Sequence, residues 1–275
     1  MTYAVADVLK RLSTLPPFPK VTAKLLAMLE DETVSVEDLA GIISTDPSLA
    51  VKVIHLSNSP FYMSARQVQS VRDAVFVLGI NSIKNITAAL SIQKGLAAVQ
   101  PRSHTFAMFE FWKHSYATAI TASRLGARHD RRLGDTLYLA GLIHDVGKMI
   151  QAYYWPDLWT GLYKTQEQTG EMFHVIEDRL GAHSHAEIAG QLLRNWKFPT
   201  AISDLVQGHH IPFDEALPGD IGRRTLQEAD MLVIAMGHGF PHPDRRVYGL
   251  DIEAHRELIQ IVETELEHQL KVLDS

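Results

Sequence analysis

The stretch 134–152, GDTLYLAGLIHDVGKMIQA, combines a helical pattern of apolar residues with an adjacent His144–Asp145 pair, followed by Gly147 and Lys148. Neighbouring side chains on an α-helix point about a hundred degrees apart, so both can reach one ion only at a helix end or a local distortion. Gly147 favours a helix end at this position. Taken alone, the pair favours a core histidine beside a solvated aspartate, so a metal site requires ligands from elsewhere in the chain.

The composition excludes several classes of site. The 275 residues are 46% apolar and 21% charged, which is typical of a globular protein. The formal charge of −6 argues against a broad surface for nucleic acid or an anionic membrane. The chain has no cysteine, which excludes disulfides, thiolate metal sites and cysteine nucleophiles. Any metal must therefore be held by nitrogen and oxygen.

The sequence carries no pattern for secretion or membrane insertion. The first residues, MTYAVADVLKRL, predict the start of a helix and lack the basic-then-apolar order of a signal peptide. The longest apolar runs, 74–80 and 137–143, are far shorter than a membrane span. We therefore expect a soluble cytoplasmic protein.

Nearly every segment has apolar residues at helical spacing, which predicts an all-α fold. Capping patterns mark three helix starts: Ser35 with Asp38, Asp46 with Pro47, and Ser70 with Asp73. Helices are expected at residues 21–29, 39–43, 48–56, 74–78, 80–98, 106–125, 134–152, 172–179, 185–196, 201–209, 223–236 and 252–272. The segment with Trp155, Pro156, Gly161 and Gly170 is interpreted as more broken.

Histidine usage divides the chain into two lobes. Residues 1–100 contain one of the fourteen histidines, His55, and the others lie between His104 and His268. A short break near Pro101 separates the two parts. We expect an N-terminal helical lobe, 1–100, packed against a helical lobe, 101–275, that carries the candidate metal ligands.

Several of these histidines lie on predicted packing faces. His114 is in mid-helix among small residues, although an interior histidine bonded to a carbonyl would show the same pattern. His185 begins a helix and precedes a packing face, whereas His183 beside it is better explained as a surface residue. The pair His209–His210 follows an apolar helix, where a polar helix terminus is the alternative.

Asp230 lies inside an apolar helix, where an unpaired carboxylate is costly; the alternatives to a metal are exposure or a salt bridge with Arg223 or Arg224. Imidazole and carboxylate without thiolate suit iron, manganese, zinc or similar divalent ions. Seven candidate ligands fit two ions that activate water for phosphoryl displacement. They are His114, His144, Asp145, His185, His209, His210 and Asp230.

The order of these motifs resembles the HDOD (HD-related output domain) family, within the HD superfamily of metal-dependent phosphohydrolases. The resemblance covers about residues 8–235. The blocks that carry it are LPPFPKVTAKLLAML, DLAGIISTDPSLAVKVIHLSNSPFY, SVRDAVFVLGI, FWKHSYATA, LAGLIHDVGK, HAEIAGQLLRNWKFP and the His209–His210 pair before Pro212. It implies a multi-helical HD-domain-like bundle with an N-terminal helical lobe packed against it.

The resemblance also implies roles for the candidate ligands. The core HD ligands would be His114, His144, Asp145 and Asp230, and the additional histidines of the two-metal HD-GYP type would be His185, His209 and His210. In that pattern Asp145 bridges the ions and Lys148 faces a substrate phosphate. After His210 the sequence IPFDEALPGD replaces the further HD-GYP elements, so the resemblance does not extend to a cyclic dinucleotide phosphodiesterase.

Two functions of different kinds follow from the resemblance. The first is a signalling protein that retains a di-metal site and hydrolyses a phosphate ester or nucleotide, with Asp145 and Lys148 in the catalytic site. The second is a non-catalytic output module that binds protein partners and has a relic or sensory metal site, as in the many HDOD proteins that look degenerate at these positions. Direct regulation of nucleic acid is a third idea, which the acidic charge disfavours.

Overall fold

The computed structural model describes residues 10–11, 20–29, 31–59, 67–97, 99–212, 220–241 and 252–273. Within these ranges the protein is all-α, as predicted, and no β-strand is present. Most of MTYAVADVLKRL, where a helix start was predicted, and most of the IPFDEALPGD segment lie outside the described residues. No helix in the described ranges has the length and apolar character needed to span a membrane.

The first half of the chain forms short helices whose starts are capped as predicted. Ser35, Asp46 and Ser70 each accept a hydrogen bond from the backbone N–H three residues later, at 3.0–3.2 Å. Gly79, with φ at +88°, lies at the turn between two of these helices. The helices are α2 (Lys20–Met28), α3 (Val36–Ser44), α4 (Pro47–Ser57), α5 (Val71–Leu78) and α6 (Ile80–Leu96).

The second half contains the longer helices and the candidate ligands. Its α-helices are α7 (Met108–Ala127), α8 (Arg131–Ile143), α9 (Val146–Tyr154), α10 (Pro156–Thr169), α11 (Phe173–Leu180), α12 (His185–Asn195), α13 (Thr200–Gln207), α14 (Ile221–Val233) and α15 (Arg256–Leu273). A π-helix, Ile234–His238, continues α14, and a 3₁₀ turn, Glu253–His255, precedes α15.

The prediction of a broken segment around Trp155, Pro156, Gly161 and Gly170 is correct at its two ends and wrong between them, because α10 begins after Trp155 and ends before Gly170. Pro156 occupies the first turn of α10, where its missing N–H costs no intrahelical hydrogen bond. Gly161 is accepted inside the helix. The left-handed Gly170 ends it.

The predicted helix over 134–152 is interrupted at the His-Asp pair, as the geometry of adjacent ligands requires. Helix α8 ends at Ile143 and α9 begins at Val146, so His144 and Asp145 lie in the turn between them. Gly147 does not end the helix, because it is the second residue of α9.

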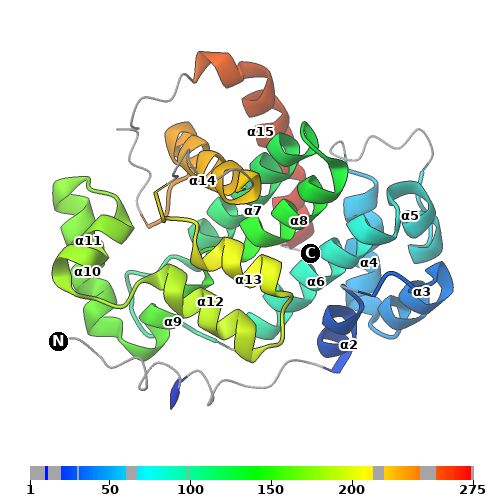
Figure 1. The fold of residues 1–275 in the computed structure, drawn as a ribbon, viewed down its shortest axis with the longest axis horizontal. Coiled ribbons are helices and arrows are strands. Elements are labelled where there is room, and N and C mark those ends of the chain that lie inside the picture. The colour runs from blue at the N-terminus through cyan, green and yellow to red at the C-terminus, as the bar shows by residue number, and fades with distance from the viewer. Residues whose placement is uncertain are drawn as a thin grey trace.

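Helices α7 and α8 pack closely at the centre of the molecule (Figure 1). A Cβ at Gly141 of α8 would lie 2.8 Å from the Cα of Ala119 in α7, so glycine permits this approach. Helices α2 to α5 lie on one side of the pair and α10 and α11 on the other. The two halves of the chain meet where α6 packs on α8 and α15 on α4, including ring contact between His55 and His268.

Candidate metal centre

Five parts of the second half bring all seven predicted ligands into one cluster, and α2 to α6 contribute none of them. Six of the seven side chains belong to residues that are 0–5% exposed, and His210 is half-buried. The ligands are His114 from α7, His144 and Asp145 from the α8–α9 turn, His185 from the start of α12, His209 and His210 after α13, and Asp230 from α14.

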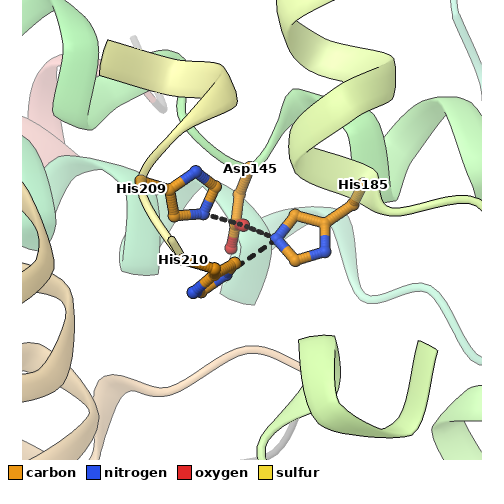
Figure 2. Close-up of side chains that lie close together, drawn as sticks. All are labelled: Asp145, His185, His209 and His210. Carbon is orange, nitrogen blue, oxygen red and sulfur yellow. Dashed lines mark hydrogen bonds and ion pairs between the residues drawn. The ribbon is translucent and has the colours of Figure 1, made fainter. Parts of the chain in front are cut away.

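Asp145 lies between two groups of imidazoles. Its Oδ2 is 3.2 Å from Nε2 of His114 and 3.4 Å from Nε2 of His144. Its Oδ1 is 3.2 Å from Nε2 of His185 and 3.9 Å from Nε2 of His209. Figure 2 shows the carboxylate between the ring of His185 and those of His209 and His210. Each group has its ligand atoms within 4.8 Å of one another, and Asp145 is shared by both.

Asp230 belongs to the group around His114. Its Oδ1 lies 3.3 Å from Nε2 of His114 and 3.7 Å from Nε2 of His144. The alternative of a salt bridge with Arg223 is not observed, since Arg223 pairs with Asp220. The carboxylate of Asp230 is therefore directed into the cluster.

The outer nitrogens of three ligands are fixed by backbone carbonyls. A carbonyl only accepts, so each Nδ1 carries a proton, and when the ring is neutral each Nε2 presents its lone pair to the cluster. For His114, the alternative of a carbonyl-bonded interior histidine is therefore also correct, because the other nitrogen remains available. Nδ1 of His114 donates to the carbonyl oxygen of His238 at 2.9 Å. Nδ1 of His144 donates to that of Gly141 at 2.7 Å, and Nδ1 of His209 donates to that of Val206 at 2.6 Å.

Several atoms of the cluster have no hydrogen-bond partner in the described part of the chain. Oδ1 of Asp145, Oδ1 of Asp230 and Nε2 of His209 are buried in this way. The Nε2 atoms of His114 and His144 lie 3.3 Å apart, and two lone pairs at this distance repel unless a proton or metal ion lies nearby. Buried polar atoms left unpaired are costly, so the site favours a bound cation.

The buried charges favour the same conclusion. Asp145, Asp230 and Glu177 are three buried carboxylates, and Lys148, which pairs with Asp145, is the buried ammonium beside them. Two negative charges therefore remain in excess when the imidazoles are neutral. A nitrogen and oxygen donor set with this charge fits divalent metal ions.

Lys148 lies against Asp145 within the cluster. It is 5% exposed, and its Nζ donates to Oδ2 of Asp145 at 2.7 Å and to the carbonyl of Phe240 at 3.0 Å. The predicted contact with a substrate phosphate stays a prediction.

The neighbouring charges alter the protonation of the first group. Burial opposes protonation of His144, but the neighbouring carboxylates of Asp145 and Asp230 outweigh it and raise the pKa of His144 to about 10. Burial would raise the pKa of Asp145, but His144 and Lys148 hold it well below its ordinary value. Burial likewise opposes ionisation of Asp230, and the neighbouring His114 and His144 hold its pKa well below the ordinary value.

In the second group, around His185, the pKa values of the histidines shift in opposite directions. Burial opposes protonation of His185, but Glu177 and Asp145 raise its pKa above the ordinary value. Burial, followed by the charge of neighbouring imidazoles, lowers the pKa values of His209 and His210 well below 6.5. Without metal, His144 and His185 are therefore the ligands whose protonation the cluster favours.

The close approach of α9 and α12 depends on Gly147. A Cβ at this position would lie 1.9 Å from the carbonyl oxygen of His185, which is backbone and cannot rotate away. The glycine therefore brings the helix that follows Asp145 against the first residue of α12. This contact sets the spacing between Asp145 and His185.

The structure adds residues that the sequence did not reveal. Glu177 bonds to His185, Gln151 bonds to Glu177, and the ring of His174 stacks on His210 with centroids 4.0 Å apart. Glu177 lies on the face of α11 that buries Phe173 and Ile176, so a carboxylate on an apolar face was the available signal. His183, expected at the surface, is half-buried, and its carbonyl accepts a bond from Gln151.

Comparison with solved structures identifies the same fold in two bacterial proteins. A candidate phosphohydrolase from Shewanella amazonensis SB2B has 21% identity and a TM-score of 0.76, covering 98% of both chains. A candidate signal transduction protein from Marinobacter aquaeolei VT8 has 24% identity and a TM-score of 0.74, covering all of this chain and 62% of that one.

Sequence comparison extends the relationship. An uncharacterized protein of Treponema pallidum (strain Nichols) is 22% identical over 210 residues, or 76% of this chain. The matched region spans 40% of the length of that relative. The HDOD domain itself matches residues 15–212, which is most of the chain. With its helical fold and the motif order of its two halves, the chain belongs to the HDOD family.

Proposed function

We propose that this HDOD protein is a bacterial signalling protein that binds two divalent metal ions and hydrolyses a phosphate ester or a nucleotide. One observation carries the proposal: the two oxygens of Asp145 face two separate groups of imidazole nitrogens. A single ion would not require a shared, buried carboxylate with ligands on both sides. Names given to two proteins of the same fold, a candidate phosphohydrolase and a candidate signal transduction protein, agree with it.

The ligands divide into two sets that share Asp145. His114, His144 and Asp230 would hold one ion, and His185, His209 and His210 the other. Divalent ions supply charge neutralisation for a phosphoryl group and lower the pKa of water, so that a nucleophile forms at neutral pH. Iron, manganese and zinc all accept this donor set.

Lys148 would supply the positive charge that the protein itself, apart from the metal ions, offers to a substrate phosphate. An ammonium group has three donors, and the bonds to Asp145 and Phe240 use two of them. We assign the third to a phosphate oxygen of the substrate. The partly exposed His210, with His174 stacked on it, marks the side from which the substrate would enter.

The alternative is a non-catalytic output module that binds protein partners. Six ligands are at most 5% exposed, and the Phe240 carbonyl already occupies one donor of Lys148. A site closed in this way suits a structural or sensory ion, because catalysis needs an open coordination position.

Hydrolysis assays distinguish the two functions. Protein loaded with Mn²⁺ or Zn²⁺ is assayed on p-nitrophenyl phosphate, bis(p-nitrophenyl) phosphate and nucleoside triphosphates. We expect the wild-type protein to turn over at least one substrate. Asp145→Asn should lower this rate more than about 100-fold, because a ligand shared by both ions is changed. The control Asp178→Asn, at an exposed position, should retain the wild-type rate. Equal rates for wild type and Asp145→Asn on every substrate would reject catalysis and favour the module.

A further inference from the structure

Glu177 is a buried carboxylate with both oxygens directed at one candidate ligand. The residue is fully buried in α11. Its Oε2 accepts from Nδ1 of His185 at 2.7 Å, and its Oε1 accepts from the backbone N–H of His185 at 3.0 Å. One carboxylate therefore holds both the ring and the main chain of His185, which leaves the ring little freedom to rotate.

Gln151 supports this carboxylate from a third helix. Its Nε2 donates to Oε1 of Glu177 at 2.5 Å and to the carbonyl of His183 at 2.7 Å. Gln151 lies in α9, the helix that begins immediately after Asp145, and it is fully buried. The network thus connects Asp145 with His185 through α9, α11 and the start of α12. The close contact at Gly147 lies between the same helices.

The partners of Glu177 distinguish it from an ordinary structural carboxylate. Within the described residues its one ion-pair partner is His185, with no lysine or arginine. The backbone N–H that it accepts belongs to the first residue of α12, a donor that no helical carbonyl can satisfy. Its negative charge also lies where the helix dipole favours it.

We infer that Glu177 is a positioning residue for the ion held by His185, His209, His210 and Asp145, with Gln151 as its support; this inference rests on the proposed two-metal site. A carboxylate that accepts from the outer nitrogen of a ligand fixes the tautomer and the ring orientation and makes the inner nitrogen a stronger donor. Nothing in the described contacts connects Glu177 to the other set, His114, His144 and Asp230. Its effect is therefore specific to one ion.

The test uses Co²⁺, because its visible spectrum reports on each site. The full chain is loaded with Co²⁺, and the two affinities are measured by competition with a chelator. Glu177→Gln removes the charge at nearly constant shape. The matched control is Glu187→Gln, an exposed glutamate in the first turn of α12. Gln151→Leu provides a second variant that keeps Glu177.

We expect Glu177→Gln to weaken one of the two Co²⁺ ions by about 10- to 100-fold and to change the absorption bands of that ion alone. Gln151→Leu should weaken the same ion by a smaller factor, and Glu187→Gln should leave both ions unchanged.

Two results would overturn the inference while leaving the two-metal site intact. One is wild-type affinity for both ions in Glu177→Gln. The other is an equal weakening of both ions together with a lower unfolding temperature of the metal-free variant, which would assign Glu177 a purely structural role. Absence of bound Co²⁺ in the wild-type protein would instead reject the proposed function, and the inference with it.

Discussion

At the scale of single residues, the cluster must balance its charge in one of two ways. Three buried carboxylates lie in or beside the cluster with one ammonium, and without metal the excess charge is offset by protons on His144 and His185, whose pKa values are raised. Metal ions offset the same charge, but they require Nε2 of these rings to be unprotonated. Metal and protons therefore compete for the same atoms.

This competition predicts proton release on metal binding. An ordinary imidazole, with a pKa of 6.5, is already neutral at pH 8, whereas His144, with a pKa of about 10, is still charged. We expect at least one proton to be released per chain at pH 8, and apparent affinity to rise about tenfold per pH unit for each proton displaced. Calorimetry in buffers of different ionisation enthalpy measures this number. Binding without proton release at pH 8 would contradict the proposed charge balance.

Asp230 allows a prediction for one of the two sets. Its Oδ1 faces His114 and His144, so Asp230→Asn should weaken the ion of that set by more than about tenfold, because a charged ligand becomes neutral. The other ion should stay bound. Metal analysis after dialysis, beside the exposed control Asp178→Asn, shows whether one ion, both or neither is lost. Loss of neither would remove Asp230 from the ligand set.

The candidate ligands could be predicted from the sequence because the short motifs that contain them occur along the chain in the order typical of the HDOD family. His114 and Asp230 are conspicuous as polar residues within apolar helices. The role of Glu177 could not be assigned in the same way: its place on the apolar face of α11 indicates burial, but the residue it holds lies on another helix. The carbonyl of Phe240 has no side-chain signal at all, and only the fold brings it to Lys148.

At the scale of helices, the site depends on where helices end and how closely they approach. The turn between α8 and α9 lets His144 and Asp145 point into the same cluster, and helical spacing with the geometry of adjacent ligands predicted this distortion. Helix α10, which the sequence did not predict, shows that proline and glycine do not always break a helix. Proline at a helix start and one interior glycine are both compatible with a helix.

Gly147 gives the prediction that belongs to this scale. Gly147→Ala places a Cβ against the His185 carbonyl, so we expect a loss of about 1–3 kcal/mol in the free energy of unfolding and weaker metal binding. Gly161→Ala in α10 is the matched control, because nothing lies within 4 Å of its Cβ and alanine favours a helix by up to about 1 kcal/mol. Urea denaturation of both variants measures the difference. Equal stability of the two variants would show that α9 and α12 can separate at no cost.

At the scale of the whole molecule, the two halves share a packed boundary. Helix α6 packs on α8, which leads into the His144–Asp145 turn, and α15 packs on both α4 and α7. The candidate ligands all come from the second half, yet α7, which carries His114, contacts α15, and α8, which leads into His144, contacts α6. The distribution of histidines along the chain predicted two lobes, but it could not show which helices form the boundary between them.

This packing predicts that metal stabilises both halves together. Each ion that binds only the folded state, at a hundred times its dissociation constant, adds about 2.7 kcal/mol and raises the unfolding temperature by about 5 °C. Calorimetry with and without a chelator should show one transition that shifts as a whole. Two transitions, with only one sensitive to metal, would show that the lobes unfold independently.

The most direct test of the two-metal site is a crystal structure of protein purified without chelator, with anomalous diffraction recorded at the edges of iron, manganese and zinc. We expect two anomalous peaks on opposite sides of the Asp145 carboxylate, one beside His114, His144 and Asp230 and the other beside His185, His209 and His210. Metal analysis of the same sample should approach full occupancy. The absence of any peak at Asp145, with less than about 0.2 ion per chain and no binding on titration, would contradict the site.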